Sequence, residues 1–147
     1  GNPPGITTDW PAVVFNKYEG GCSLYVTGDL ENNLAHRGTF IRLLRQIATK
    51  PFQIEADAPK CVEMTLLHQR DKSLYIINLL NFHFQDHLLS NVPIEGIKVK
   101  VRLNRKDVKK LVMLPEKKEL EYRFEDGLLE FTVPKLNIFK MIALEYR

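Results

Sequence analysis

The sequence has few of the residues that mark specialised protein classes. It contains two cysteines and one tryptophan, and its net charge is only +3 at pH 7. No apolar run approaches the roughly 18 residues of a membrane span, and no segment has the charged, apolar and small-residue succession of a signal peptide. Nucleic-acid binders usually carry a clustered basic face, which so small a net charge does not indicate. We therefore expect no membrane partner and no nucleic-acid partner.

The composition that remains is that of an ordinary globular protein. The 147 residues are 44% hydrophobic and 27% charged, enough for one domain, or a compact domain with a small appendage, to bury a core without metals or disulfides. The chain opens with Gly-Asn-Pro-Pro-Gly and no initiator Met. We expect residues 1–9 to be a leader or severed linker, and the chain to be a fragment of a longer protein.

The two cysteines, Cys22 and Cys61, lie in separate predicted strands without CxxC spacing or histidine neighbours. Buried free thiols are the favoured interpretation. A single disulfide is the alternative, and it would imply an oxidising compartment. The sequence leaves the compartment open between the bacterial cytoplasm and the periplasmic or extracellular space.

Two hairpins are predicted from apolar segments that flank turn residues. Residues 12–18 and 22–26 flank Glu19-Gly20-Gly21, where glycine is expected to supply the positive φ of a tight turn. The segments within residues 58–81 flank the polar turn 69–73. Both patterns favour antiparallel pairing.

One amphipathic helix is predicted over residues 38–49. Phe40, Leu43, Leu44 and Ile47 recur at helical spacing, and Pro51 ends the pattern. The opposite face carries Arg42, Arg45 and Gln46, which we expect to be solvated.

The rest of the chain alternates apolar and polar residues with period two, which is typical of strands with one buried face. Asp126-Gly127 predicts another hairpin turn. Residues 138–146 are apolar on both faces and are therefore expected in the centre of a sheet. We predict a mainly β protein, α+β overall: residues 1–50 form a leader, a β-hairpin and a helix, and residues 51–147 form an antiparallel β-sandwich. The alternating strand positions are Val62, Met64 and Leu66; Ile97, Val99, Val101 and Leu103; Leu120, Tyr122 and Phe124; and Leu129, Phe131 and Val133.

The candidate ligand-binding residues lie at the end of the second segment of residues 58–81 and just beyond it. His83 and His87 are four residues apart beside Asp86. That spacing would hold a metal on a helix, but not in a strand-to-loop exit, so we predict no metal site. Asn78 and Asn81 have amides that could recognise sugar hydroxyls. An asparagine at a strand end more often satisfies backbone groups of a neighbouring loop, and we favour that role.

A basic tract runs through residues 98–106 and continues at Lys109 and Lys110. It lacks interleaved aromatics for base stacking. We interpret it as a solvated sheet face whose lysines protect an edge strand against pairing.

No catalytic group stands out. The loop and strand-end acids Asp29, Glu31, Glu55 and Asp57 cannot be paired from the sequence, although glycoside hydrolysis requires two carboxylates in one cleft. No serine lies in a GxSxG elbow. We predict no catalytic residue and no cofactor in this chain.

The order of segments resembles the C-terminal end of bacterial glycoside hydrolases and hydrolase-like proteins, in which a β-galactosidase-trimerisation-type domain precedes a small β-sandwich. Asn78 stands where such proteins commonly have a His before Leu-Leu-Asn, and Gly20-Gly21-Cys22 replaces a Gly-Lys-Gly turn. The segments that carry the resemblance are PAVVFNKYEGG at 11–21, LYVTGDL at 24–30, DAP at 57–59, LYIINLLN at 74–81, PI at 93–94 and VPKL at 133–136.

This resemblance implies that residues up to about 50 are the end of a flavodoxin-like layer, and that catalytic carboxylates belong to an upstream domain of the same polypeptide. The expected function is a non-catalytic accessory or assembly module. Its expected partner is the upstream catalytic domain, and the formation of homo-oligomers is an additional expectation. The alternative is a free-standing β-sandwich that binds carbohydrate or protein.

Overall fold

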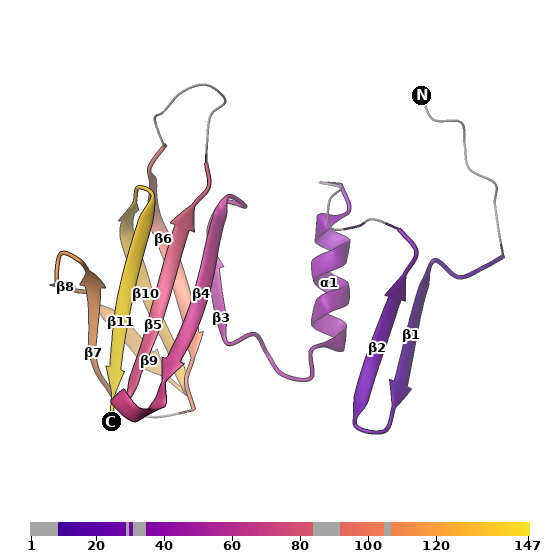
Figure 1. The fold of residues 1–147 in the computed structure, drawn as a ribbon, viewed down its shortest axis with the longest axis horizontal. Helices are drawn as coiled ribbons and strands as arrows, with labels where there is room; N and C mark the ends of the chain where they lie inside the picture. Colours follow the sequence, from indigo (N-terminus) through magenta and orange to yellow (C-terminus); the bar gives the residue numbers. More distant parts are fainter. Residues whose placement is uncertain (1–8, 29, 31–34, 84–91, 105–106) are drawn as a thin grey trace. The chain divides into compact units, whose positions relative to one another are not determined.

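The computed structural model describes residues 9–28, 30, 35–83, 92–104 and 107–147. The chain divides into two compact units, residues 1–51 and residues 52–147 (Figure 1), and each is described by itself.

The first unit contains the predicted hairpin. Strand β1 (Val13–Tyr18) pairs antiparallel with β2 (Gly21–Val26). Only Glu19 and Gly20 lie between the strands, and the positive φ of the turn belongs to Glu19, at 50°. The prediction that a glycine supplies it was wrong, because Glu19 takes the first loop position and Gly21 is already paired in β2.

The predicted helix is present as α1 (Arg37–Ile47). It lies beside β2, and the Cys22 thiol donates a hydrogen bond to the Ile47 carbonyl at 3.3 Å. Its predicted apolar residues are half-buried, and its polar face is exposed as predicted. None of the described side chains of this unit is fully buried.

The second unit contains two antiparallel sheets. The four-stranded sheet has the order β3-β6-β10-β9. Its hairpin between β9 and β10 closes at Asp126 and Gly127, whose φ values are 50° and 76°. A Cβ on Gly127 would lie 2.9 Å from the Leu103 carbonyl oxygen, so this turn requires glycine. The strands are β3 (Ile54–Asp57), β6 (Ile94–Arg102), β9 (Tyr122–Glu125) and β10 (Leu128–Leu136).

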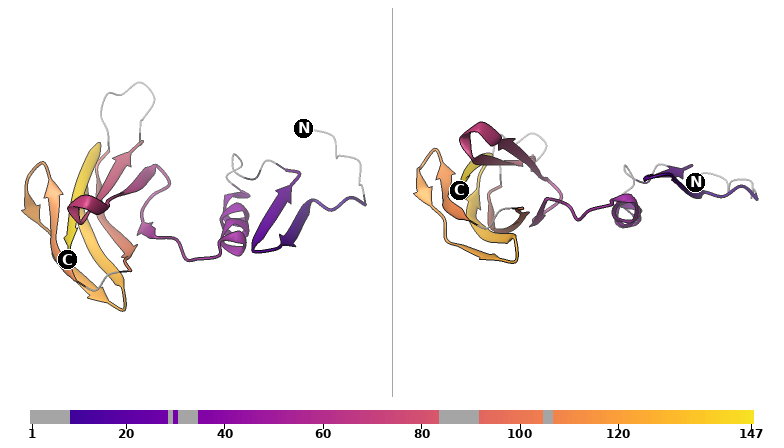
Figure 2. Two further views of the ribbon diagram at one scale, coloured as in Figure 1. Left: turned by 60° about the horizontal axis from the view of Figure 1, so that its bottom comes forward. Right: turned by 90° about the horizontal axis from the view of Figure 1, so that it is seen from below.

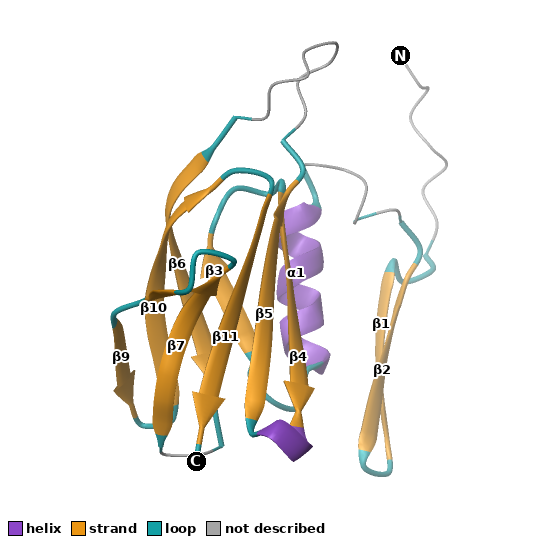
Figure 3. Cartoon of the chain, turned by 60° about the vertical axis from the view of Figure 1, so that its left-hand side comes forward, coloured by secondary structure: helices purple, strands orange, loops and turns teal. Residues whose placement is uncertain are grey.

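The five-stranded sheet has the order β4-β5-β11-β7-β8, and β4, β5, β11 and β7 lie side by side in Figure 3. A 3-10 turn, η1 (Arg70–Lys72), joins β4 to β5 and confirms the predicted polar turn. Strand β11 occupies the middle position, as predicted from its two apolar faces. The strands are β4 (Val62–Gln69), β5 (Leu74–Asn81), β7 (Val108–Leu114), β8 (Lys118–Glu119) and β11 (Phe139–Tyr146).

One hydrophobic core joins the inner faces of these two sheets, which confirms the predicted β-sandwich; Figure 2 shows the layers from two further sides. Alternate residues of the long strands enter this core, which explains the alternation of apolar and polar residues in the sequence. Strand β8 contributes no buried residue, and Tyr122 of β9, one of the predicted alternating positions, is 39% exposed. The fully buried side chains include Ile77, Leu79, Leu111, Ile142 and Leu144 from the five-stranded sheet and Ile97, Val99, Val101, Leu129 and Val133 from the four-stranded sheet.

The basic tract does not protect an edge. Strand β6 pairs with β3 on one side and β10 on the other, so the predicted edge position was wrong. Its lysines are exposed, as predicted, but they alternate with acidic residues of the neighbouring strands rather than discouraging a partner strand. No helix in the described part of the chain is long and apolar enough to cross a membrane.

Candidate functional site

Asn81, at the end of β5, is buried with 2% of its surface exposed and anchors three segments of backbone. Its side-chain nitrogen donates to the carbonyls of Val92 and Asn137, both at 2.8 Å. Its side-chain oxygen accepts a hydrogen bond from the backbone N–H of His83 at 2.9 Å. These contacts confirm the predicted role of satisfying loop backbone groups. A sugar hydroxyl could bind the Asn81 amide only by displacing these hydrogen bonds.

The imidazole of His83 is exposed, whereas its backbone is held by Asn81. His87 and Asp86 lie outside the described residues, so any joint role of His83 and His87 stays a prediction. Within the described ranges, no three His, Cys, Asp or Glu side chains are grouped as metal ligands.

Asn78 points to the face of the sheet opposite Asn81, so the structure does not bring the two candidate amides together. Its nitrogen donates to the hydroxyl of Thr65 on β4 at 3.1 Å, so the predicted role of satisfying loop backbone groups was wrong for Asn78. Its carbonyl oxygen is shielded from solvent and has no hydrogen-bond donor among the described residues. A carbonyl oxygen shielded from water without a hydrogen-bond donor lowers the free energy of unfolding, so the shielding of the Asn78 oxygen needs an explanation.

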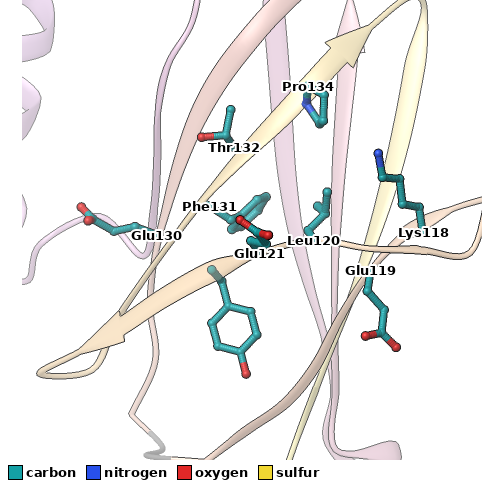
Figure 4. A pocket seen from close by; sticks show the side chains of 9 residues that line it. Lys118, Glu119, Leu120, Glu121, Glu130, Phe131, Thr132 and Pro134 are labelled. Atoms are coloured by element: carbon teal, nitrogen blue, oxygen red, sulfur yellow. The ribbon is translucent and has the colours of Figure 1, made fainter.

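An open pocket of about 560 Å³ lies where the chain crosses from β8 to β9 (Figure 4). The crossing is fixed by Leu120, which is buried in the core between the two short strands. Lys118, Glu121 and Thr132 are exposed residues of its lining. Sequence reasoning missed this pocket because its walls come from segments about ten residues apart that follow the ordinary strand pattern.

Two of the three acidic residues that line this pocket are paired with lysines. Glu130 bonds to Lys100 at 2.6 Å, and this hydrogen bond, with the lysine charge, holds the pKa of the Glu130 carboxyl below its ordinary value. Glu119 bonds to Lys110 at 2.8 Å and raises the pKa of that ammonium group. Retaining and inverting glycosidases need one carboxyl with a raised pKa. Lys100 acts on Glu130 in the opposite direction.

The other acids considered in the sequence lie opposite lysines or outside the described residues. Glu55 and Asp57 lie on β3, directly opposite Lys100 and Lys98 of β6. Asp29 and Glu31 lie outside the described residues. Among the described residues, Glu55 and Asp57 share one face of β3, two residues apart, and each has a lysine of β6 as its register partner.

A cluster of rings that the sequence analysis did not predict closes one end of the core. His68 stacks on Tyr75 with ring centroids 4.0 Å apart, and its Nε2 lies 2.7 Å from the Tyr146 hydroxyl. Both tyrosines are buried. The signal was available, because His68 and Tyr75 are register partners across the β4–β5 hairpin.

Both cysteines are free thiols, as in the favoured interpretation, but they are half-buried rather than buried. Cys22 is in β2, and Cys61 immediately precedes β4.

Two facing antiparallel sheets without a closed barrel define the second unit as a β-sandwich. The chain is similar in structure to α-L-fucosidase isoenzyme 2 from Paenibacillus thiaminolyticus, with a TM-score of 0.68 and 24% sequence identity. The match covers 84% of this chain and 21% of the fucosidase chain. The chain thus spans about a fifth of the length of that protein. At this identity the likeness shows a shared fold.

A cycloisomaltooligosaccharide glucanotransferase from Paenibacillus sp. gives a TM-score of 0.47 at 12% identity, over 62% of this chain and 16% of its own. The chain matches no protein-family model and no curated protein sequence.

Proposed function

We propose that this chain is a non-catalytic accessory or assembly module from the C-terminal region of a bacterial glycoside hydrolase. The observation that carries the proposal is the fold that the chain shares with about a fifth of an α-L-fucosidase. The charge arrangement supports it, because Glu119 and Glu130 of the pocket at Leu120 pair with lysines, and the acids of β3 lie opposite lysines. Chemistry then belongs to another part of the polypeptide.

The first unit supports the same proposal. Its described part has two strands and one helix, and no described side chain in it is fully buried. A two-stranded sheet of this size is marginally stable by itself. We infer that residues 1–51 are the end of a larger flavodoxin-like layer, whose other strands lie upstream in the parent polypeptide.

The experiment is to read the gene upstream of Gly1 and to express the complete polypeptide. The proposal predicts an upstream domain of barrel size and turnover of an aryl glycoside, with an α-L-fucoside in the panel. Glu121→Gln and Glu55→Gln in the complete polypeptide should leave kcat unchanged. A reading frame with no such domain, or loss of kcat in either variant, would contradict the proposal.

A second candidate is a free-standing module that binds carbohydrate, and the pocket at Leu120 favours it (Figure 4). Exposed Glu121, Thr132 and Tyr122 offer acceptors, a hydroxyl and an aromatic ring of the kinds that sugar sites use. Affinity electrophoresis in polysaccharide gels separates the two candidates. Retardation that Tyr122→Ala and Glu121→Ala abolish would favour the binding module.

A further inference from the structure

The outer faces of the two sheets differ in chemistry. On the four-stranded sheet, one row of register partners runs Glu55, Lys100, Glu130, Arg123 from β3 to β9. Its charges alternate in sign at each step, and Lys100 bonds to Glu130 at 2.6 Å. This is the solvated face expected of an antiparallel sheet.

The outer face of the five-stranded sheet is apolar over its central rows. One row runs Leu67, Ile76, Ala143, Val112 from β4 to β7. The next row continues from Asn78 through Met141 to Leu114. We call these six apolar residues with Asn78 the apolar outer face. Leu67 is 53% exposed, and the other six are half-buried by one another.

Asn78 lies in the middle of this face and behaves as an interior residue. A side-chain amide on a water-facing sheet normally turns its oxygen to solvent. The Asn78 oxygen is instead covered by its neighbours and lacks a donor in the described chain. Water therefore does not reach this oxygen at the centre of the face. Such continuous apolar surface, rimmed by charge, is typical of a protein contact.

We propose that the apolar outer face docks against the upstream part of the parent polypeptide, on an apolar surface of that part. This inference rests on the proposed function. The fucosidase that shares the fold has about four-fifths of its chain outside the matched region, which favours further polypeptide as the occupant. The first unit is marginally stable by itself, and its strands need further strands to pair with. An upstream part of the polypeptide would supply those strands and would also cover the apolar outer face of the sandwich. Docking would bury the one face of the sandwich that water solvates poorly.

Thiol labelling tests the proposal in two proteins, the 147-residue chain and the complete polypeptide that carries it. Both receive Cys22→Ser and Cys61→Ser to remove the native thiols. Leu67→Cys reports on the apolar outer face, and Thr65→Cys is a second reporter in case the first variant fails to fold. Thr132→Cys, exposed on the outer face of the four-stranded sheet, is the matched control. A water-soluble maleimide then gives the labelling rate of each thiol.

The proposal predicts fast labelling of both faces in the 147-residue chain. In the complete polypeptide the reporter rate should fall at least about ten-fold, since labelling then requires local opening, while the control rate stays within about three-fold. Equal reporter rates in the two proteins would overturn the proposal. Protection that grows with the concentration of the 147-residue chain would overturn it in favour of a second copy. Protection of the reporter in the 147-residue chain at every concentration would also overturn the proposal, because residues 1–51 would then be what covers the apolar outer face.

The outcome is separable from that of the proposed function. Reporter protection in a complete polypeptide that turns over no glycoside would uphold docking and contradict the hydrolase assignment. Glycoside turnover with an unprotected reporter would uphold the hydrolase assignment and contradict docking.

Discussion

At the scale of single residues, two asparagines of one strand show how side-chain direction decides a role. Asn81 faces inward, and the structure satisfies its amide with three backbone partners. Asn78 faces outward, and its oxygen is shielded without a donor. The same residue type is therefore a structural anchor at one position and a costly group three residues earlier.

Substitution of the two asparagines should give opposite results. Asn81→Ala should lower the free energy of unfolding by about 3 kcal/mol, because it leaves two carbonyls and one N–H without their partner. Asn78→Leu should leave stability unchanged or raise it by about 1 kcal/mol, because it removes an unsatisfied acceptor at the cost of one bond to Thr65. Urea unfolding measures both. A larger loss from Asn78→Leu than from Asn81→Ala would contradict this account.

The charged row on the four-stranded sheet predicts a pH dependence. The hydrogen bond and charge of Lys100 hold the pKa of Glu130 below its ordinary value of 4.5. The pair therefore stabilises the fold above that ordinary pKa, and the stabilisation is lost as the pH falls through the lowered value. Because both groups are exposed, the effect should be small and should weaken in salt.

Lys100→Met tests this dependence, with Lys98→Met on the same strand as control. NMR titration of the Glu130 carboxyl should show its pKa rising toward the ordinary value in Lys100→Met only. The acid side of the stability profile should flatten in the same variant. An unchanged Glu130 pKa would show that Lys100 is not the cause.

At the scale of elements, strands with clean alternation and a recognisable turn could be predicted from the sequence. The β4–β5 and β9–β10 hairpins met both conditions, and β11 was placed centrally because both its faces are apolar. Strand β7 was missed, since Lys109 and Lys110 precede four consecutive apolar residues and hide its period. Strand β3 is only four residues long, so its acids were interpreted as loop or strand-end residues.

The candidate site could be predicted only where the place of a residue within its strand indicates its role. The anchoring role of Asn81 followed from its place at a strand end. The shielding of Asn78 depends on β4 and β11, and the pocket at Leu120 depends on β10, so neither could be predicted from local sequence. The central place of β6 likewise depends on β3, whose pairing was not predicted.

The edge of β1 predicts self-association. Within the described residues β1 has β2 as its single neighbouring strand, and Val13, Val14 and Phe15 are each more than 40% exposed. An open apolar edge pairs readily with another strand. Light scattering should show a concentration-dependent mass that Val14→Lys reduces and Thr132→Lys does not. A monomer at high concentration, with amide exchange across residues 12–18 that dilution does not alter, would contradict this prediction.

At the scale of the whole molecule, the two units differ in how much core they hold. The second unit holds all the described side chains that are fully buried, whereas the first holds none. Hydrophobic burial is the main stabilising term, so the sandwich should carry the stability of the chain.

A fragment of residues 52–147 should therefore fold by itself. Its thermal midpoint, followed by circular dichroism, should lie within about 4 °C of the transition in the complete chain, a shift that corresponds to less than about 1 kcal/mol. A fragment of residues 1–51 should show no cooperative transition. A sandwich fragment that fails to fold would mean that residues 1–51 supply part of its core.

An activity assay on the purified 147 residues is the decisive test of our proposal that the chemistry lies outside this chain. We expect no turnover of any aryl glycoside above the buffer rate, at any pH at which the sandwich stays folded. The contradicting result would be turnover that one carboxylate substitution abolishes. The variants to test are Asp29→Asn, Glu31→Gln, Glu55→Gln, Asp57→Asn and Glu121→Gln.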